Sequence, residues 1–431
     1  MANERLYIYL DKEGYELQEE TPAMLPVDQA ESIILELIKP LDSQRDTERV
    51  NLHSAPGRIL ARVITSALDF PHWDNSAMDG YAVRFEDVQN NSVTDPVVLE
   101  IIEEIPAGCQ PQFSIQPGQA ARIFTGACLP QGADTIVMQE DTRRQGNSVV
   151  ILTTPKPQAF VRHQGSYYRA GEPLLTPGTL IGAPEIAVLA AAQCTEIIVY
   201  RKPRVAIFST GDELVTPDQP LQPGQLVDSN QYALTAWVEK IGGEAIPLGI
   251  VRDQPEALAT VITEAMAMAD VVISTGGVSV GDYDYVEEIL ERLGGEIVIR
   301  SVAVKPGKPL TVAKFAEQDC VYFGVPGNPV SALVSCWRFV QPALQKLAGF
   351  SNWVPVLITA RTSADLLSDG KRELYLWGQL QIVDGNYQFY LSAGQHNSGN
   401  LINLAGTTGL AVVPVGTTFI PQGEFVSVLQ V

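Results

Sequence analysis

Four consecutive strand-loop-helix units between Arg204 and Leu344 constrain the fold of this chain more than any other feature. The apolar runs VAIFS, EAIPLGIV, DVVIS and VYFGV each lead through a loop containing Gly, Pro or Asp into a segment with helical character. Such alternation predicts a doubly wound α/β domain with a parallel sheet. Ligands of these sheets bind at the carboxyl ends of the strands, which is where the loops lie.

Changes in composition divide the rest of the chain. A long segment of the N-terminal half is rich in Val, Ile, Thr, Pro and Gly with little helical period, which predicts a β-rich insertion. The C-terminal end alternates apolar and polar residues around an Asp384-Gly385 hairpin turn, which predicts an all-β domain. The predicted division is an N-terminal extension (1–24), a discontinuous helical domain I (25–64 and 166–200), a β-rich domain II (65–165), the α/β domain III (201–348) and an all-β domain IV (349–431).

Two helix starts carry capping patterns. Asp28 is followed three residues later by Glu31, ahead of an apolar stripe, which predicts a capping box. Asp253 and Glu256 have the same spacing, so helix capping is one interpretation of Asp253. The other interpretation is that its carboxylate faces a ligand.

Composition excludes several classes of function. The net charge of −21 opposes general attraction to nucleic acid or to an anionic membrane surface. No stretch approaches the roughly 20 apolar residues that span a bilayer, and we expect a cytoplasmic protein. The five cysteines are odd in number and form no CxxC pair, so no disulfide framework or zinc site is indicated. An anionic small substrate remains possible if positive charge is gathered locally.

The segment TGGVSVGDYDY has the character of an anion-binding turn. Gly276 and Gly277 follow a buried-type strand, where backbone N–H groups can approach a phosphate. Asp282 and Asp284 add oxygen ligands beside it, which is how Mg²⁺ is commonly held together with a phosphate. The alternative is a glycine turn whose aspartates cap the next helix.

Further polar groups follow other strands. Asp212 and Glu213 in STGDEL end one strand and Asp253 ends another, so acidic side chains converge at one edge of the sheet. A divalent cation would reconcile this convergence with an anionic ligand. Helix capping is again the alternative.

Positive charge is supplied by the turn VKPGKP. It places Lys305 and Lys308 around a tight Pro-Gly turn, and two held ammonium groups form a receptor for an oxyanion. A solvated pair of surface lysines is the alternative. GVPGNPVSALV adds a turn into a helix that begins near Ser331, which is either a further ligand group or a structural elbow.

Two segments of the insertion, DFPHWDNSAMDGYAV and RIFTGACLPQGADTIVMQED, fit no regular secondary structure and are expected to be loops. Thr125 in the second follows an apolar run and is expected to show its hydroxyl to solvent.

In order and spacing, NSAMDGYAV, RIFTGA, FSTGDELV, STGGVSVGDYDY, VKPGKP and GVPGNPVSA resemble the molybdopterin molybdotransferases, the MoeA and gephyrin E-domain family. The resemblance runs from about Leu25 to the C-terminus. It implies an elongated homodimer of four-domain subunits that cleaves adenylated molybdopterin with a divalent cation, Mg²⁺, and inserts molybdate into the dithiolene, releasing AMP. An upstream molybdopterin adenylyltransferase is the implied partner.

The resemblance also assigns roles to residues. Asp253, Ser279 and Asp284, with Gly276 and Gly277, would serve the nucleotide, its pyrophosphate and Mg²⁺, the metal being held by Asp253 and Asp284. Asp79 and Thr125 of domain II would complete the cleft. The groups expected around molybdate are Lys305, Lys308, Ser331, Arg372 and Ser398.

Two departures from the family pattern concern domain IV. Lys371-Arg372 stands where the family shows a Gly-Arg pair, and AGQHNSGN aligns only loosely around Ser398. Residues 1–24 have no counterpart.

Two other functions compete with this assignment. Adenylylation of molybdopterin predicts a short chain without the flanking β domains. A non-catalytic scaffold of the gephyrin type predicts that the motif lysines or aspartates are lost, yet Lys305, Lys308, Asp253 and Asp284 are all present. Because domains II and III are separated along an elongated subunit, the cleft is expected to be shared between two chains.

Overall fold

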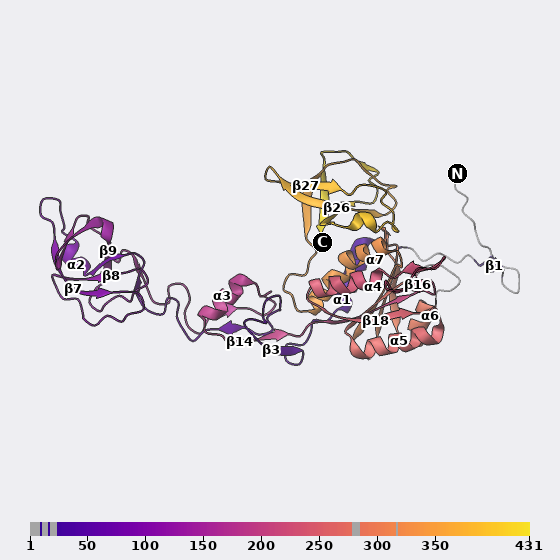
Figure 1. The fold of residues 1–431 in the computed structure, drawn as a ribbon, viewed down its shortest axis with the longest axis horizontal. Helices are drawn as coiled ribbons and strands as arrows, with labels where there is room; N and C mark the ends of the chain where they lie inside the picture. The colour runs from indigo at the N-terminus through magenta and orange to yellow at the C-terminus, as the bar shows by residue number, and fades with distance from the viewer. Residues whose placement is uncertain (1–8, 11–15, 18–23, 278–284, 316–317) are drawn as a thin grey trace.

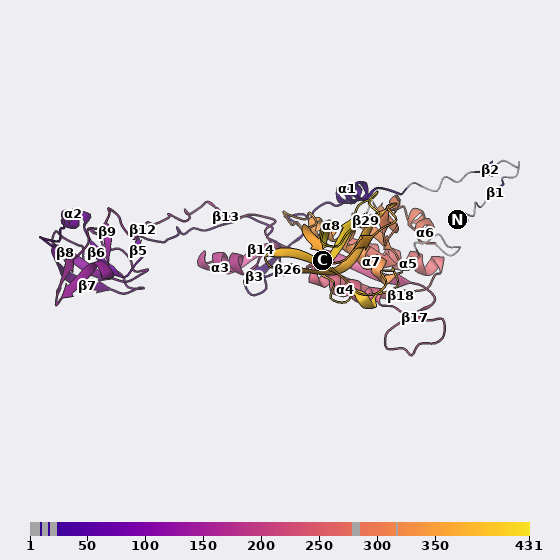
Figure 2. The same cartoon turned by 90° about the horizontal axis from the view of Figure 1, so that it is seen from above.

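The computed structural model describes residues 9–10, 16–17, 24–277, 285–315 and 318–431. The chain is elongated (Figures 1 and 2), with domain II at one end, domains III and IV together at the other, and a narrow neck between them. None of the helices in these residues is both long and apolar enough to cross a membrane.

Domain III contains a six-stranded sheet in the order β18-β15-β19-β23-β22-β20. Its first four strands are parallel, which confirms the predicted α/β fold, whereas β22 runs antiparallel to both β23 and β20. The sheet is therefore mixed rather than wholly parallel. Its strands are β15 (Arg204–Thr210), β18 (Glu244–Val251), β19 (Val271–Thr275), β20 (Glu296–Ser301), β22 (Pro309–Phe315) and β23 (Cys320–Val325).

Helices cover both faces of this sheet, as the doubly wound arrangement requires. One apolar core joins the sheet to α4, α7 and α8, and a second joins it to α5 and α6. Between α7 and α8 the chain forms one π-helical turn, η2. The bounds are α4 (Asn230–Lys240), α5 (Pro255–Met268), α6 (Val286–Arg292), α7 (Pro329–Ser335), η2 (Cys336–Val340) and α8 (Gln341–Leu347).

Helix α1 (Val27–Leu37), which the sequence assigned to domain I, packs against domain III. Its buried residues join the core of α4, α7 and α8. The predicted capping box is wrong, because Pro26 occupies the N-cap position and no side chain caps the helix. Glu31 instead pairs with Arg338 of η2, with 2.8 Å between Oε2 and Nη2.

The neck is built from three short antiparallel strand pairs. The chain leaves through β3, β4 and β5 and returns through β12, β13 and β14, each outgoing strand pairing with a returning one. Helix α3 packs beside them. The bounds are β3 (Thr47–Asn51), β4 (Ile64–Thr65), β5 (Asn75–Ser76), β12 (Val161–Arg162), β13 (Pro173–Leu175), α3 (Ala183–Ala191) and β14 (Glu196–Tyr200).

An ion-pair cluster joins the neck to domain III. Arg201 donates two hydrogen bonds to the carboxylate of Asp270, at 2.7 and 2.8 Å, and one from Nε to Asp46 at 3.0 Å. Because all three side chains are largely buried, this cluster holds the end of the neck firmly against the sheet.

Domain II is a six-stranded sheet, which confirms the predicted β-rich insertion. The order is β10-β11-β7-β8-β6-β9, with apolar clusters on its two faces. Its elements are β6 (Gly80–Val83), α2 (Phe85–Val88), β7 (Val98–Ile105), β8 (Gln119–Ile123), β9 (Thr135–Met138), η1 (Gln139–Asp141), β10 (Thr142–Gln145) and β11 (Ser148–Ile151).

Domain IV is a closed sheet, because β28 pairs with both β30 and β26. The predicted hairpin turn is confirmed, since Asp384 and Gly385 both have positive φ between β26 and β27. Strand β21 of the VKPGKP segment extends this sheet and so ties it to domain III. The elements are β21 (Val304–Lys305), β24 (Leu357–Thr362), β25 (Leu366–Leu367), β26 (Glu373–Val383), β27 (Asn386–Leu391), η3 (Ile402–Leu404), β28 (Gly409–Val413), β29 (Phe419–Ile420) and β30 (Phe425–Gln430).

Candidate active site

Two adjoining cavities lie where the carboxyl ends of the domain III strands meet domain IV. The larger has a volume of about 770 Å³ and the smaller about 380 Å³. Three residues line both: Pro309, Pro326 and Asn328. The two cavities therefore meet at these three residues.

The larger cavity contains Asp253, Gly276 and Gly277 from the predicted site. Gly276 has a φ of +88°, and a Cβ at this position would lie 2.4 Å from the carbonyl oxygen of Thr210. Only glycine therefore allows the loop after β19 to pack against the end of β15. The backbone of Gly276 and Gly277 lies open to the cavity as a result.

Asp253 does not cap α5, so the capping interpretation is wrong. Gln254 occupies the N-cap position, and no side chain caps the helix. The Asp253 carboxylate instead accepts a hydrogen bond from Thr210 Oγ1 and lines the larger cavity.

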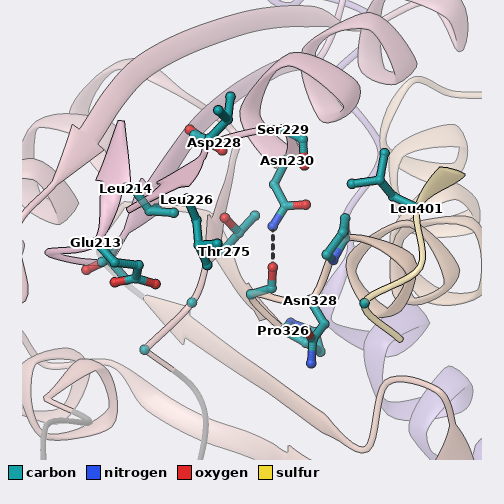
Figure 3. A pocket seen from close by; sticks show the side chains of 18 of the residues that line it. Glu213, Leu214, Leu226, Asp228, Ser229, Asn230, Thr275, Pro326, Asn328 and Leu401 are labelled. Atoms are coloured by element: carbon teal, nitrogen blue, oxygen red, sulfur yellow. Dashed lines mark hydrogen bonds between the residues drawn. The ribbon is translucent and has the colours of Figure 1, made fainter. Parts of the chain in front are cut away.

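Glu213 and Asp228 add further negative charge to the wall of the larger cavity (Figure 3). Asp228 is buried and accepts hydrogen bonds from the backbone nitrogen and Nε2 of Gln231, both at 3.2 Å. The sequence did not single out Asp228 as a cavity residue, because an aspartate just before a helix resembles an ordinary cap. Asn230 was also missed. It is buried, and its Nδ2 donates to the carbonyl oxygen of Gly327 at 2.8 Å.

The smaller cavity brings together side chains from distant parts of the chain. All five groups that the sequence associated with molybdate line it: Lys305, Lys308, Ser331, Arg372 and Ser398. Domain III supplies three of them and domain IV the other two, so the cavity exists only because the domains pack together.

The positive charges of the smaller cavity are not equivalent. Lys305 Nζ is paired with Asp369 Oδ2 at 3.1 Å, and Arg372 Nη1 donates to the carbonyl oxygen of Val304 at 3.3 Å. Hydrogen bonds from the Lys371 backbone and from Lys305 lower the pKa of Asp369. The Lys308 side chain has no ion pair or hydrogen bond with any residue that the structure describes. It is therefore the cation most available to an anion.

Close packing fixes the turn that carries the two lysines. Gly307 has a φ of +106°, and a Cβ there would lie 2.8 Å from Ser335 Oγ of α7. The turn is thereby held against α7, beside Ser331, with its lysines on either side.

An aromatic wall that the sequence did not reveal faces these cations. Trp377 is buried, and its Nε1 donates to Asn403 Oδ1 at 2.9 Å. The ring of His396 lies 4.3 Å from the Trp377 ring, and Tyr375 completes the wall. Burial raises the pKa of Tyr375 far above its usual range, so its hydroxyl stays protonated.

Asp79 and Thr125 lie together in domain II and line neither cavity. Within one chain, domain II lies at the opposite end from domains III and IV (Figure 1). Hydrogen bonds from the backbone and the hydroxyl of Thr125 lower the pKa of Asp79.

Three predicted groups, Ser279, Asp282 and Asp284, lie outside the described residues. Within the part of the chain that is described, there is no group of three or more His, Cys, Asp or Glu side chains placed to hold a metal ion.

Comparison with known families covers almost the whole chain. Residues 25–192 match the MoeA N-terminal region (domain I and II), 206–346 match a probable molybdopterin binding domain, and 359–431 match the MoeA C-terminal region (domain IV). A molybdopterin molybdenumtransferase of Nostoc sp. is 61% identical over 93% of this chain and 92% of its own. The namesake of Haemophilus influenzae is 38% identical over 77% of this chain and 79% of its own.

Solved structures agree with the sequence comparisons. Two MoeA crystal structures from Pyrococcus horikoshii superpose with TM-scores of 0.78 and 0.82, at 31% and 28% identity. Each match covers 95% of this chain and at least 99% of the other.

Proposed function

The chain belongs to the MoeA family, and from that membership we propose that it is a molybdopterin molybdenumtransferase, which cleaves adenylated molybdopterin, inserts molybdate into the dithiolene and releases AMP. The observation that carries this proposal is the pair of adjoining cavities with opposite charge. The acidic, glycine-walled cavity suits a nucleotide with its metal, and the cationic cavity suits molybdate.

The larger cavity would take the nucleotide half of the substrate. Backbone N–H groups at Gly276 and Gly277 suit phosphate oxygens. Asp253, Glu213 and Asp228 would repel an anion by themselves, so this arrangement needs a cation to balance it.

Mg²⁺ fits this requirement, because it binds in proteins through one or two carboxylates and completes its coordination with phosphates and water. Asp253 would hold it, together with Asp284 as the sequence predicts. When bound, the ion would neutralise the developing charge on the pyrophosphate as AMP leaves.

The smaller cavity would take molybdate and the dithiolene. Lys308, Arg372 and Lys305 would bind the oxyanion, while the wall of Tyr375 and Trp377 offers the apolar contact that sulfur prefers. The two thiols bind molybdenum, and their protons leave with one molybdate oxygen as water. The protein supplies charge and orientation, and no cysteine takes part.

A homodimer with shared clefts would give Asp79 and Thr125 a place in the reaction. Thr125 is exposed and Asp79 half-buried in domain II, and the neighbouring Trp73 and Met78 are exposed as well. A two-fold axis would bring this surface to the cavities of the partner. We also place the protein in the cytoplasm, where an upstream molybdopterin adenylyltransferase would supply its substrate.

The test is to incubate the purified protein with adenylated molybdopterin, molybdate and Mg²⁺. We expect stoichiometric AMP release together with activation of an apo-molybdoenzyme. Samples without molybdate or with a metal chelator are the controls. If neither product forms with intact substrate, the alternative, a non-catalytic scaffold of the gephyrin type, is favoured.

A further inference from the structure

The loop between β23 and α7, residues 326–328, contains one asparagine, Asn328, whose side chain stabilises no part of the described fold. Asn328 occupies the N-cap position of α7, where an asparagine normally accepts a hydrogen bond from the first turn. No such cap bond forms, and its side chain makes no hydrogen bond with the residues that the structure describes. Its amide therefore remains free to bind a ligand.

The backbone around Asn328 is nevertheless held from both sides. Asn230 Nδ2 of α4 donates to the carbonyl oxygen of Gly327, the dashed bond of Figure 3. On the other side, the backbone nitrogen of Val330 donates to the carbonyl oxygen of Ser398 in domain IV at 3.3 Å. Asn328 is thus a free side chain on a fixed backbone.

Asn328 also lies where the two cavities meet. Asn328 is the one hydrogen-bonding side chain that lines both cavities, since the other two shared residues are Pro309 and Pro326. A substrate with its nucleotide in the larger cavity and its dithiolene in the smaller must pass its pyrophosphate through this junction. A pyrophosphate there requires N–H donors, and the prolines offer none.

We propose that Asn328 is a catalytic residue whose Nδ2 donates a hydrogen bond to the pyrophosphate where the substrate crosses from one cavity to the other. This inference rests on the proposed function and adds a residue to it. The amide orients the bond that breaks relative to the molybdate in the smaller cavity. It thereby couples AMP release to the occupancy of the second cavity.

The alternative is that Asn328 only starts the helix, and three substitutions separate the two roles. Serine and aspartate cap helices as well as asparagine, whereas alanine does not. If Asn328 acts as a cap, only Asn328→Ala lowers the melting temperature and the activity. If it binds pyrophosphate, all three variants keep the melting temperature but release AMP more slowly.

The three substitutions are expected to slow AMP release by different amounts. Asn328→Ala and Asn328→Ser should slow AMP release roughly 10- to 100-fold, the effect of one hydrogen bond to a charged group. Asn328→Asp should be slower still, because an isosteric carboxylate repels the pyrophosphate. Asn352, exposed on the linker to domain IV, provides the matched controls Asn352→Ala and Asn352→Asp, which should behave as wild type.

A binding measurement keeps the inference separate from the proposed function. We expect inorganic pyrophosphate with Mg²⁺ to bind the wild type in calorimetry, and to bind Asn328→Ala at least tenfold more weakly. An unchanged affinity, or full AMP release by Asn328→Ala, would overturn the role of Asn328. Absence of AMP release by the wild type would overturn only the proposed function.

Discussion

Thr125 donates two hydrogen bonds to a single carboxylate oxygen of Asp79, one from its backbone nitrogen at 2.8 Å and one from its Oγ1 at 2.7 Å. Both bonds favour the ionised carboxylate and lower its pKa. The stability that they contribute is therefore present above the unfolded-state pKa and is lost as the pH falls through the lower folded-state value.

The substitution Thr125→Val should raise the pKa of Asp79 towards its ordinary value, because the hydroxyl bond is lost while the backbone bond remains. Thr125→Ser keeps the hydroxyl and should keep the low pKa. An NMR titration of the carboxyl carbon measures both. Equal pKa values in the valine and wild-type proteins would contradict the hydrogen-bond explanation.

Lys308→Ala should raise the KM for molybdate roughly 10- to 100-fold and leave AMP binding nearly unchanged, since one charged donor is removed. The effect of Lys305→Ala should be smaller, because Asp369 already neutralises that lysine. Lys314→Ala, which removes an exposed pair with Glu296, is the control. Equal loss of molybdate use and AMP binding would point to a general structural role for Lys308.

Asp253→Asn should abolish metal-dependent AMP release while leaving the fold intact, because asparagine can still accept the bond from Thr210 but carries no charge. The sequence predicts the same result for Asp284→Asn. The measurement is AMP release against Mg²⁺ concentration, with Asp384→Asn in the domain IV hairpin as the control. Unaltered release by Asp253→Asn would remove this residue from the metal site.

Asp79→Ala protein mixed with Lys308→Ala protein, under conditions of subunit exchange, should regain activity at molybdate concentrations far below the raised KM of the lysine variant, where neither protein alone turns over. In a shared cleft, one of the two sites in each heterodimer receives both intact halves, so recovery should reach up to half of the wild-type rate per heterodimer. If heterodimers form without any recovery, each chain builds its own site.

Arg338→Met should destabilise the protein by on the order of 3 kcal/mol, because it leaves Glu31 and the Tyr375 hydroxyl without their shared partner. Arg300→Met removes a more exposed pair with Glu287 and should cost less than about 1 kcal/mol. Urea unfolding monitored by circular dichroism gives both values. If both substitutions lowered the free energy of unfolding equally, the contacts of Arg338 with Glu31 and Tyr375 would not be what joins α1 and domain IV to domain III.

The sequence predicts the four parallel strands of the domain III sheet because each of those strands is followed by a helix that returns the chain. It does not predict the direction of β20 and β22, since an apolar run has the same pattern in either direction. The spacing of the apolar residues in α1 shows which face of the helix is buried, but not which domain packs against that face. The packing of α1 against domain III was therefore not predictable from the sequence.

Motif order also locates the cations of the smaller cavity, although they come from two domains. The aromatic wall was not predictable, because Trp377 and His396 look like ordinary core residues until the domain IV sheet closes. The pairing of Lys305 with Asp369 was hidden for the same reason, since the two residues are far apart in the chain. Long-range packing decides such contacts, and local pattern carries no information about it.

Because the strands of the neck are paired, the two ends of domain II lie next to each other. The chain enters and leaves it side by side, at the pairing of Asn75–Ser76 with Val161–Arg162. The apolar clusters of its sheet contain no residue from domain III or domain IV. Cutting at the neck should therefore yield a separately folding fragment, and a short turn joining the two cut ends should leave the remainder of the chain folded.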